Sequence, residues 1–425
     1  MKIAIFSDLH LGFSPKGRET DAFDNAKKAM ILAISENPDL IILPGDLFDE
    51  SIPKYETLLE AFDILSLAKH HKKPETKIEI KSEARNEIAL HRKKKDSEEP
   101  LTFSGIPVIA IHGTHEYAGK DYKNVIHLLE ASGFVTYLHG SQIFAEKGNE
   151  KVAIQGFGGV PEKKALDVLR FLNPQPVSNA VNLFILHQSI KEFLPFDDDM
   201  IASVSISDLP AGFDLIIDGH LHWSNELDDK ETGKHFLLPG STVLTQMKHL
   251  ESTKKKAVYF YDTKTKQVSF KEIPEQREFF YKKLQFKEAN LQKLKDEINK
   301  ALTEILSGKK FAKKPLIKLK LLGSLSSGLN QADISEESLA EDFAEKAVIA
   351  IDRNFSGMDD LKTKLKNLGE LHNSKKSAIS LGLDMLDDNL KKTDFNNAFD
   401  VHRIFKLLEE DEVDKAIEVI LGKKE

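Results

Sequence analysis

The chain has 425 residues, 40% hydrophobic and 30% charged, a balance typical of a globular protein with two or three domains. It contains no cysteine, which excludes disulfides, thiolate metal sites, iron–sulfur clusters and cysteine nucleophiles. The net charge of −8 argues against a uniformly basic nucleic-acid coat, although a local basic face stays possible.

Apolar runs in the sequence are short. None approaches the roughly 18 residues that a membrane-spanning helix needs. A strand-like run starts at Lys2, which leaves no room for a signal peptide. We therefore expect a cytoplasmic protein with no membrane partner.

Residues 1–275 alternate strand-like and helix-like segments, the pattern of a layered α/β domain. Apolar residues at helical spacing predict helices over 21–37, 55–69 and 121–132, and closing strands are predicted over 236–238, 257–261 and 267–270. Residues 69–105 are rich in Lys, Arg and Glu and are predicted to be an inserted polar helix or loop. This charged insertion is either a solvated surface feature or an arm that contacts phosphates.

The remaining residues predict a second, smaller α+β domain over 276–352. Its predicted order is strand 279–286, helix 291–306, strand 315–322 and helix 336–351. Residues 353–398 have the composition of a linker, and residues 399–425 carry amphipathic stripes typical of a C-terminal helical segment. That segment packs either on its own domain or on a partner.

Five strand-like runs each stop at a residue type that binds metals. They are 2–7, 40–44, 107–111, 181–186 and 213–217, and they are followed by Asp8-Leu9-His10, Gly45-Asp46, His112-Gly113-Thr114-His115-Glu116, His187 and Asp218-Gly219-His220-Leu221-His222. Ligands of open α/β sheets gather at the carboxyl ends of the strands. Each histidine taken alone is more often a structural residue, but the ordered set predicts one polynuclear metal centre.

The predicted centre holds two divalent ions. Asp8, His10 and His222 are expected at one ion and His187 and His220 at the other, with Asp46 bridging them. Nitrogen and oxygen ligands suit Mn²⁺, Fe or Zn²⁺ better than Mg²⁺. Two such ions clamp the attacking and leaving oxygens of a phosphoester. His115, in the loop after the third strand, is the expected catalytic residue that protonates the leaving oxygen.

This ordered set resembles the calcineurin-like metallophosphoesterases, and within them the Mre/SbcD-type nucleases of DNA double-strand-break repair. The similar stretches are Asp8-Leu9-His10-Leu11-Gly12, Gly45-Asp46-Leu47-Phe48-Asp49, Gly219-His220-Leu221-His222 and Pro239-Gly240-Ser241. The resemblance implies a sandwich of two β-sheets flanked by helices, a capping domain at 276–352 and a C-terminal helical segment.

The same resemblance implies a function. Members are Mn²⁺-dependent exonucleases and endonucleases that cut DNA ends by two-metal hydrolysis, without reading sequence. They work with an SMC-like coiled-coil ATPase, which here would bind residues 399–425. They also dimerise through helices of the nuclease domain, matching 55–69 and 121–132 here. A nucleoid-associated location follows from this expectation.

Two positions depart from the family pattern. Thr114 stands where the family usually has a metal-binding Asn, and Asp49 stands where it often has a His that assists exonuclease cleavage. A threonine hydroxyl is a poorer ligand, and an ordinary Asp is no proton donor at neutral pH. Two alternatives therefore stay open: a phosphatase or cyclic-nucleotide phosphodiesterase, and a DNA-bridging scaffold with a weakened nuclease site.

Overall fold

The computed structural model describes most of the chain. The described residues are 1–71, 77–81, 101–102, 105–119, 123–194, 204–326, 329, 331, 334–355, 383, 386–387, 390, 400–409 and 412–420. Most of the predicted charged insertion and of the predicted linker lie outside this described part.

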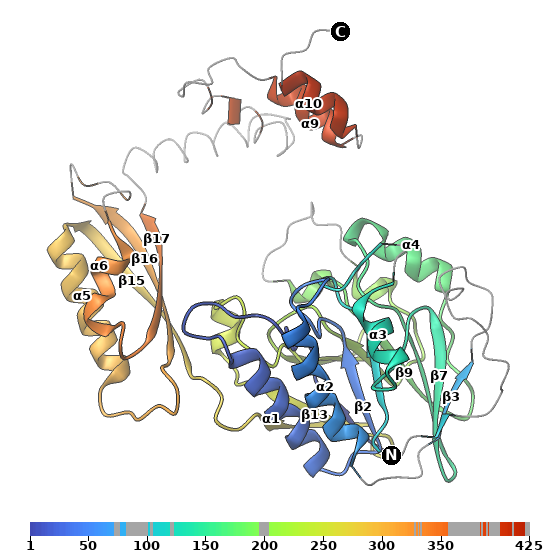
Figure 1. Cartoon of the computed structure of the whole chain (residues 1–425). Coiled ribbons are helices and arrows are strands. Elements are labelled where there is room, and N and C mark those ends of the chain that lie inside the picture. The colour runs from blue at the N-terminus through green and yellow to red at the C-terminus, as the bar shows by residue number, and fades with distance from the viewer. Residues whose placement is uncertain are drawn as a thin grey trace. The chain divides into compact units, whose positions relative to one another are not determined.

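A six-stranded sheet forms one layer of the N-terminal region (Figure 1). Its order is β14-β13-β1-β2-β5-β6, and β1, β2, β5 and β6 run parallel. The bounds are β1 Lys2–Ile5, β2 Leu40–Pro44, β5 Val108–Ile111, β6 Thr136–Tyr137, β13 Ala257–Asp262 and β14 Gln267–Glu272. The predicted closing strands near 257 and 267 are confirmed as an antiparallel pair of this sheet.

An eight-stranded sheet forms the second layer, in the order β11-β12-β10-β9-β8-β7-β3-β4. The bounds are β3 Lys77–Lys81, β4 Leu101–Thr102, β7 Ser141–Lys147, β8 Glu150–Gly156, β9 Val181–Leu186, β10 Leu215–Asp218, β11 Asn225–Asp229 and β12 Lys234–Leu238. Strands β3 and β4 fall inside the charged insertion, which was predicted to be helix or loop. That prediction is wrong for 77–81, because this segment pairs antiparallel with β7 at the sheet edge.

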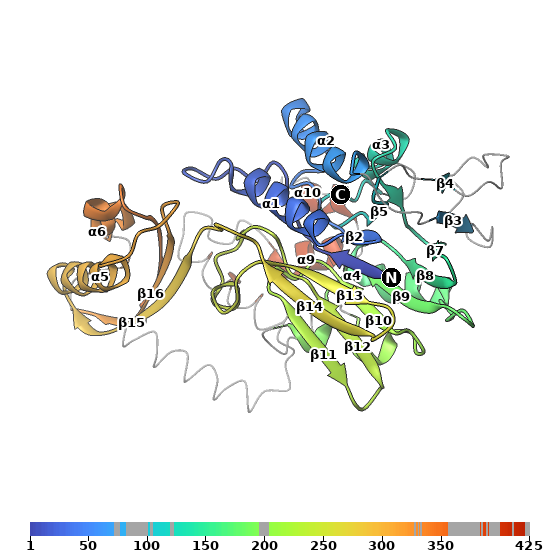
Figure 2. The same cartoon turned by 90° about the horizontal axis from the view of Figure 1, so that it is seen from below.

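Alternating side chains explain why the two sheets pack together. In β1, Ile3 and Ile5 belong to the core between the sheets, whereas Ala4, and Phe6 just after the strand, belong to the core under the helices. Helices α1 (Asp21–Ser35), α2 (Tyr55–Lys69) and α3 (Val125–Ala131) cover this outer face of the six-stranded sheet (Figure 2). Helix α4 (Glu162–Leu172) covers the outer face of the other sheet. The predicted sandwich of two sheets flanked by helices is confirmed.

The start of α3 differs from the prediction. The Asn124 side chain accepts hydrogen bonds from the backbone N–H groups of Ile126 and His127, so it caps the helix. The helix therefore begins at Val125, four residues later than the sequence pattern suggested. Gly133, with φ of 72°, follows its end as predicted.

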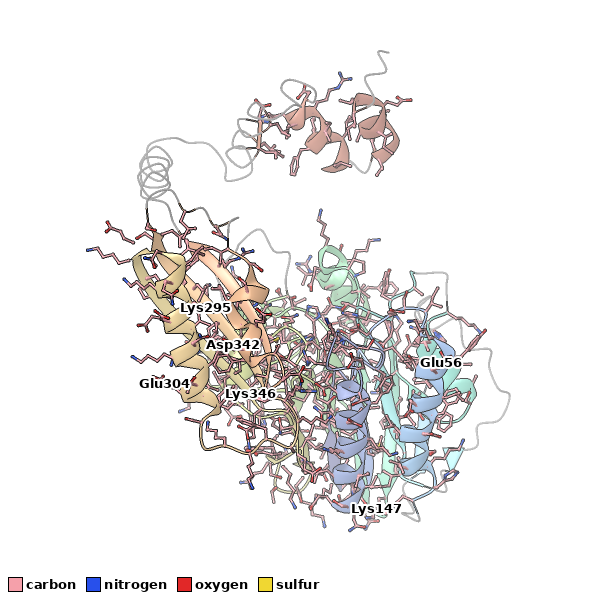
Figure 3. The ribbon with its side chains drawn as sticks, turned by 60° about the vertical axis from the view of Figure 1, so that its left-hand side comes forward. Glu56, Lys147, Lys295, Glu304, Asp342 and Lys346 are labelled. Carbon is pink, nitrogen blue, oxygen red and sulfur yellow. The ribbon has the colours of Figure 1, made fainter. Side chains whose placement is uncertain are left out.

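A three-stranded sheet follows, ordered β15-β16-β17, with bounds β15 Phe279–Ala289, β16 Leu316–Leu325 and β17 Val348–Phe355. Helix α5 (Leu291–Leu306) has its predicted bounds, and charged side chains such as Lys295 and Glu304 project from it (Figure 3). The predicted helix over 336–351 is wrong in its second half. Helix α6 ends at Ala340, and the β-branched residues Val348, Ile349 and Ile351 favour a strand instead.

The last described elements are α9 (Val401–Glu409) and α10 (Val413–Ile420), which pack against each other. The chain divides into two compact units, Met1–Leu284 with Lys295–Lys320 and Ser335–Asp352, and Gln285–Leu294 with Leu321–Ile334 and Arg353–Glu425. The predicted boundary at 275 stays a prediction. Within the described residues, none of the helices combines the length and apolar character that crossing a membrane requires.

Candidate metal centre

The carboxyl ends of strands from both sheets carry the predicted ligands. Asp8 and His10 follow β1, and Asp46 follows β2, in the six-stranded sheet. His187 follows β9, and His220 and His222 follow β10, in the eight-stranded sheet. The structure brings these six side chains together in two groups.

The first group consists of Asp8, His10 and His222, whose ligand atoms all lie within 4.8 Å of one another. His10 Nε2 is 3.2 Å from His222 Nε2, and His222 Nε2 is 3.8 Å from Asp8 Oδ1. All three residues are buried. This is the set that the sequence predicts for one ion.

The second group consists of Asp46, His187 and His220, again with ligand atoms within 4.8 Å. His187 Nε2 lies 3.1 Å from Asp46 Oδ2, and the His187 and His220 rings meet edge to face with centroids 5.2 Å apart. These are the residues predicted for the other ion. The bridging role of Asp46 stays a prediction.

Three of the imidazoles are held by an oxygen on Nδ1, which leaves Nε2 facing the group. His187 Nδ1 donates to the Pro44 carbonyl at 2.8 Å. His10 Nδ1 lies 3.0 Å from Asp49 Oδ1, and His222 Nδ1 contacts the Thr245 hydroxyl. Such contacts fix the tautomer and ring orientation of metal-binding histidines.

The donors of the first group fit a divalent cation. Within the described part of the chain, both carboxylate oxygens of Asp8 are buried without a hydrogen-bond partner. Burial raises the pKa of Asp8 to about 6. The two Nε2 atoms that face each other point lone pairs into the same space when Nδ1 carries the proton. A cation between them would satisfy both nitrogens and the Asp8 oxygens.

The second group has strong internal electrostatics. Burial alone would lower the pKa of His187, but the adjacent Asp46 carboxylate overcomes it and raises this pKa to about 10. Burial alone would raise the pKa of Asp46, and His187 instead holds it below its ordinary value. The ionised Asp46 therefore needs a positive neighbour, which a divalent cation would also supply.

Backbone strain is frequent among the candidate ligands. Four of them occupy the left-handed region, with φ of 52° at Asp8, 46° at His10, 47° at Asp46 and 71° at His220. Non-glycine residues are uncommon there, and such conformations cluster at functional sites because the surrounding structure enforces them. The backbone angles therefore indicate a functional site, and this evidence does not depend on which side chains the residues carry.

The loop after β5 lies beside both groups. The His115 backbone N–H donates to Asp46 Oδ1 at 2.9 Å, and His115 Nδ1 donates to the Asp49 carbonyl at 2.7 Å. The His115 side chain is 41% exposed, so a substrate can reach it. The Thr114 hydroxyl is 3.5 Å from Asp46 Oδ2. His115, the predicted catalytic residue, and Thr114, which differs from the family pattern, therefore lie beside the candidate ligands.

Glu116 belongs to the stretch that follows the third predicted strand, but the sequence pattern assigned it no role. Its buried carboxylate accepts the backbone N–H groups of Phe48 at 2.8 Å and Gly113 at 2.6 Å. It therefore ties the loop after β2 to the loop after β5. Burial, reinforced by the charge of Asp46, raises the pKa of Glu116 to about 8.

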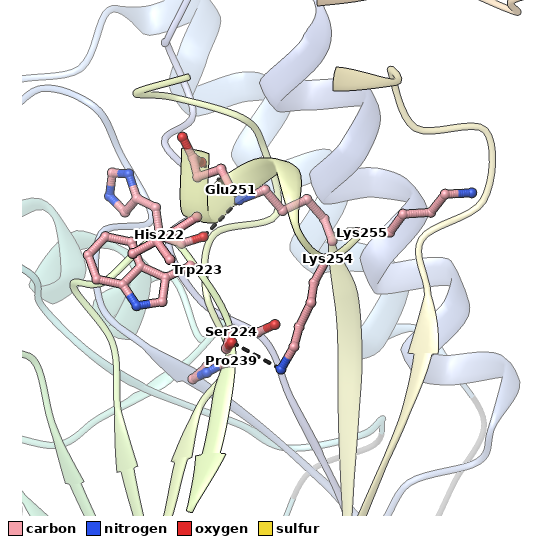
Figure 4. A pocket seen from close by; sticks show the side chains of 9 residues that line it. His222, Trp223, Ser224, Pro239, Glu251, Lys254 and Lys255 are labelled. Carbon is pink, nitrogen blue, oxygen red and sulfur yellow. Dashed lines mark hydrogen bonds and ion pairs between the residues drawn. The ribbon is translucent and has the colours of Figure 1, made fainter. Parts of the chain in front are cut away.

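A buried ion pair lies behind His222, beside the small pocket shown in Figure 4. Lys256 Nζ donates to the His222 carbonyl at 2.7 Å and to Glu251 Oε1 at 2.9 Å. Neither residue was predicted to matter, because neither lies near a ligand in sequence. The pair holds the backbone that carries one ligand of the first group.

Residues 1–224 match the family model for calcineurin-like phosphoesterases, which is half of the chain and contains every candidate ligand. The chain belongs to the calcineurin-like phosphoesterase family. Because the phosphoesterases of this family use divalent metals, the two ligand groups are its candidate metal-binding clusters. The resemblance inferred from Asp8-Leu9-His10 and Gly219-His220-Leu221-His222 is confirmed at this level.

The phosphoesterase is also similar to double-strand break repair proteins named MRE11. It is 27% identical to that of Macaca fascicularis over 368 residues, covering 75% of this chain and 50% of the relative. It is 28% identical to that of Arabidopsis thaliana over 304 residues, covering 64% and 41%, and to that of Homo sapiens over 282 residues, covering 60% and 38%. The chain thus spans half or less of the length of these relatives.

Proposed function

We propose that this phosphoesterase is a metal-dependent DNA nuclease that processes double-strand break ends with two divalent ions, most favourably Mn²⁺. The observation that carries the proposal is the pair of adjacent groups, Asp8–His10–His222 and Asp46–His187–His220. The similarity of the chain to repair proteins extends beyond the phosphoesterase match at residues 1–224. For one relative it covers 75% of the chain.

Each group of residues has a proposed role in phosphodiester hydrolysis. Ions held by the two groups would polarise the phosphodiester and lower the pKa of water. The nitrogen–oxygen donor set, rich in imidazole, favours Mn²⁺ over Mg²⁺. Asp46, beside His187 and under the His115 backbone N–H, would bridge the ions. The exposed His115 would give its proton to the leaving oxygen.

DNA is the proposed substrate because the similar proteins are named for double-strand break repair. Binding would depend on phosphates and not on bases, so affinity would fall steeply with salt. The proposed location is accordingly the nucleoid in the cytoplasm.

An SMC-like coiled-coil ATPase is the proposed partner of α9 and α10. These helices expose one apolar set, Phe405, Leu408, Val413, Ile417 and Ile420. An amphipathic helix pair with an uncovered apolar face suits a helical partner. A homodimer is proposed through α2 and α3, where Tyr55, Leu59 and Leu128 are exposed.

One assay tests the proposal. Purified protein with Mn²⁺ should degrade linear duplex DNA, and a chelator should stop it. Hydrolysis of p-nitrophenyl phosphate esters without DNA cleavage would assign the chain to phosphatases or small-substrate phosphodiesterases instead. Salt-sensitive DNA binding without Mn²⁺-stimulated cleavage would assign it to the scaffold alternative, which Thr114 and Asp49 favour.

A further inference from the structure

His220 is the histidine of the two groups whose Nδ1 has no oxygen contact described above. In His10, His187 and His222 an oxygen holds Nδ1 and leaves Nε2 toward the group. Like Asp8, His10 and Asp46, His220 has a left-handed backbone, with φ of 71°.

Glu162 lies beside the His220 ring. Its Oε1 is 3.7 Å from His220 Nε2, within ion-pair distance but longer than a hydrogen bond. Both side chains are about a quarter exposed, at 27% and 28%. A carboxylate at Nε2 favours the tautomer with the proton on that nitrogen, which leaves Nδ1 for a cation. The ring would then use the opposite nitrogen from the other three histidines.

The fold holds Glu162 in this place. It is the first residue of α4, and Ala165 and Leu169 of that helix are buried in the core under the eight-stranded sheet. The Ser189 backbone N–H donates to Glu162 Oε1 at 3.2 Å. Within the described residues, Glu162 Oε2 is buried and has no hydrogen-bond partner. The Ser189 N–H therefore holds Oε1, the oxygen nearest to His220 Nε2, in place.

We propose that Glu162 is a positioning residue that orients His220 for the cation of the Asp46–His187–His220 group. The inference rests on the proposed metal centre and adds a residue to it. Beside this group Thr114 offers only a hydroxyl, a poorer ligand, 3.5 Å from Asp46 Oδ2. Glu162 thus supports the group in which the chain departs from the family pattern.

A purely structural role for Glu162 makes a different prediction. An acidic residue in the first turn of α4 also stabilises the helix N-terminus. Losing that interaction would lower the thermal stability of the metal-free protein, with no selective effect on one cation. The two roles are therefore separated by measuring Mn²⁺ affinity at each group and metal-free stability in the same variants.

The experiment is a Mn²⁺ titration by calorimetry of the full chain and of Glu162→Ala, Glu162→Gln and Glu162→Asp. The matched control is Glu226→Gln, because Glu226 Oε1 contacts, at 3.1 Å, the Nε2 of His235, a histidine that belongs to neither ligand group. Wild type should bind two ions. Glu162→Ala should weaken one of them by about 10- to 100-fold, as loss of such contacts does at metal sites. Glu162→Asp should recover part of the loss, and Glu226→Gln should match wild type.

A double-mutant cycle tests whether Glu162 acts through His220. Adding Glu162→Ala to His220→Ala should cause little further loss of Mn²⁺ affinity. Unchanged affinities in Glu162→Ala, or equal weakening of both ions together with lower metal-free stability, would overturn the role of Glu162. Failure of wild type to bind Mn²⁺ would instead overturn the metal centre itself.

Discussion

Gly113 packs directly against the Asp46 carboxylate. A Cβ built on Gly113 would lie 2.0 Å from Asp46 Oδ1 and 2.4 Å from the Asp46 backbone nitrogen. Any side chain at 113 must therefore displace the proposed bridging ligand. The absence of a side chain at this position keeps the loops after β2 and β5 close enough to share one centre.

Gly113→Ala should consequently reduce Mn²⁺ binding at both groups and abolish cleavage. The backbone of Gly113 is not left-handed, so the clash with Asp46 is the main source of the effect. The control is Gly148→Asn, since a Cβ on Gly148 meets nothing within 4 Å and Asn tolerates its φ of +58°. Calorimetric titration of both variants checks this. Normal Mn²⁺ affinity in Gly113→Ala would show that Asp46 is not a shared ligand.

His115→Ala should separate catalysis from metal binding. His115 is exposed, and its Nδ1 contacts the Asp49 carbonyl. It lies with His10 and Asp49 in a third group whose ligand atoms are within 4.8 Å of one another, but it is not among the six proposed ligands. Loss of a general acid typically costs about 10²- to 10⁴-fold in rate. We expect a loss of this size in DNA cleavage, with Mn²⁺ affinity unchanged and His235→Ala behaving like wild type. Retained cleavage in His115→Ala would remove this residue from the mechanism.

Asp49→Ala should weaken the first group. Its carboxylate is the oxygen that holds His10 Nδ1, at 3.0 Å. Removing a contact of this kind usually lowers metal affinity by about 10- to 100-fold. Asp49→Asn keeps an acceptor oxygen and should lose less. Electron paramagnetic resonance of bound Mn²⁺ reports the occupancy of each variant, and equal occupancy in all three proteins would contradict the assignment.

Acid should destabilise the fold through His112. This buried ring donates from Nε2 to the Gly159 carbonyl at 2.9 Å and accepts from the Tyr137 hydroxyl at 2.7 Å. Burial, with help from His139, lowers the pKa of His112 well below the ordinary 6.5. Below pH 6.5 the His112 ring is therefore protonated in the unfolded chain but not in the folded chain. The free energy of unfolding falls as the pH drops below that value.

Denaturant unfolding in chelator, at a series of pH values downward from about 7, measures this effect. One such proton lowers the free energy of unfolding by at most about 1.4 kcal/mol for each pH unit. His112→Gln should remove that part of the slope, whereas His235→Gln, which changes a ring in contact with Glu226, should not. If the free energy of unfolding fell equally with pH in His112→Gln and in wild type, His112 would not be the source of the acid sensitivity.

Local patterns in the sequence predicted much of this fold. Helices α2 and α5 have their predicted bounds because apolar residues recur at helical spacing along each. The candidate ligands were found from the sequence because each lies within a few residues of the end of a buried strand, and their role as ligands stays a prediction. Residues 348–351 were assigned to the wrong element because a short apolar run suits a helix or a strand, and pairing in the β15-β16-β17 sheet decides between them.

Residues that act through tertiary contacts escaped prediction. Glu162 lies six residues beyond the end of β8, away from every predicted ligand in sequence. Lys256 binds the backbone carbonyl of His222, so no side-chain pattern in the sequence links the two residues. The one local sign near Glu162 is the pair Gly158-Gly159, where a Cβ would clash with His112 and with the Gly113 backbone. Such a pair marks a close backbone approach but does not say which side chain is brought in.

The most direct test of the central claim is a crystal structure of the Mn²⁺-soaked protein with anomalous scattering recorded for manganese. Two anomalous peaks are expected, about 3.5–4 Å apart, one at Asp8, His10 and His222, the other at His187 and His220, with Asp46 touching both. A single peak, or peaks away from Asp8 and Asp46, would contradict it.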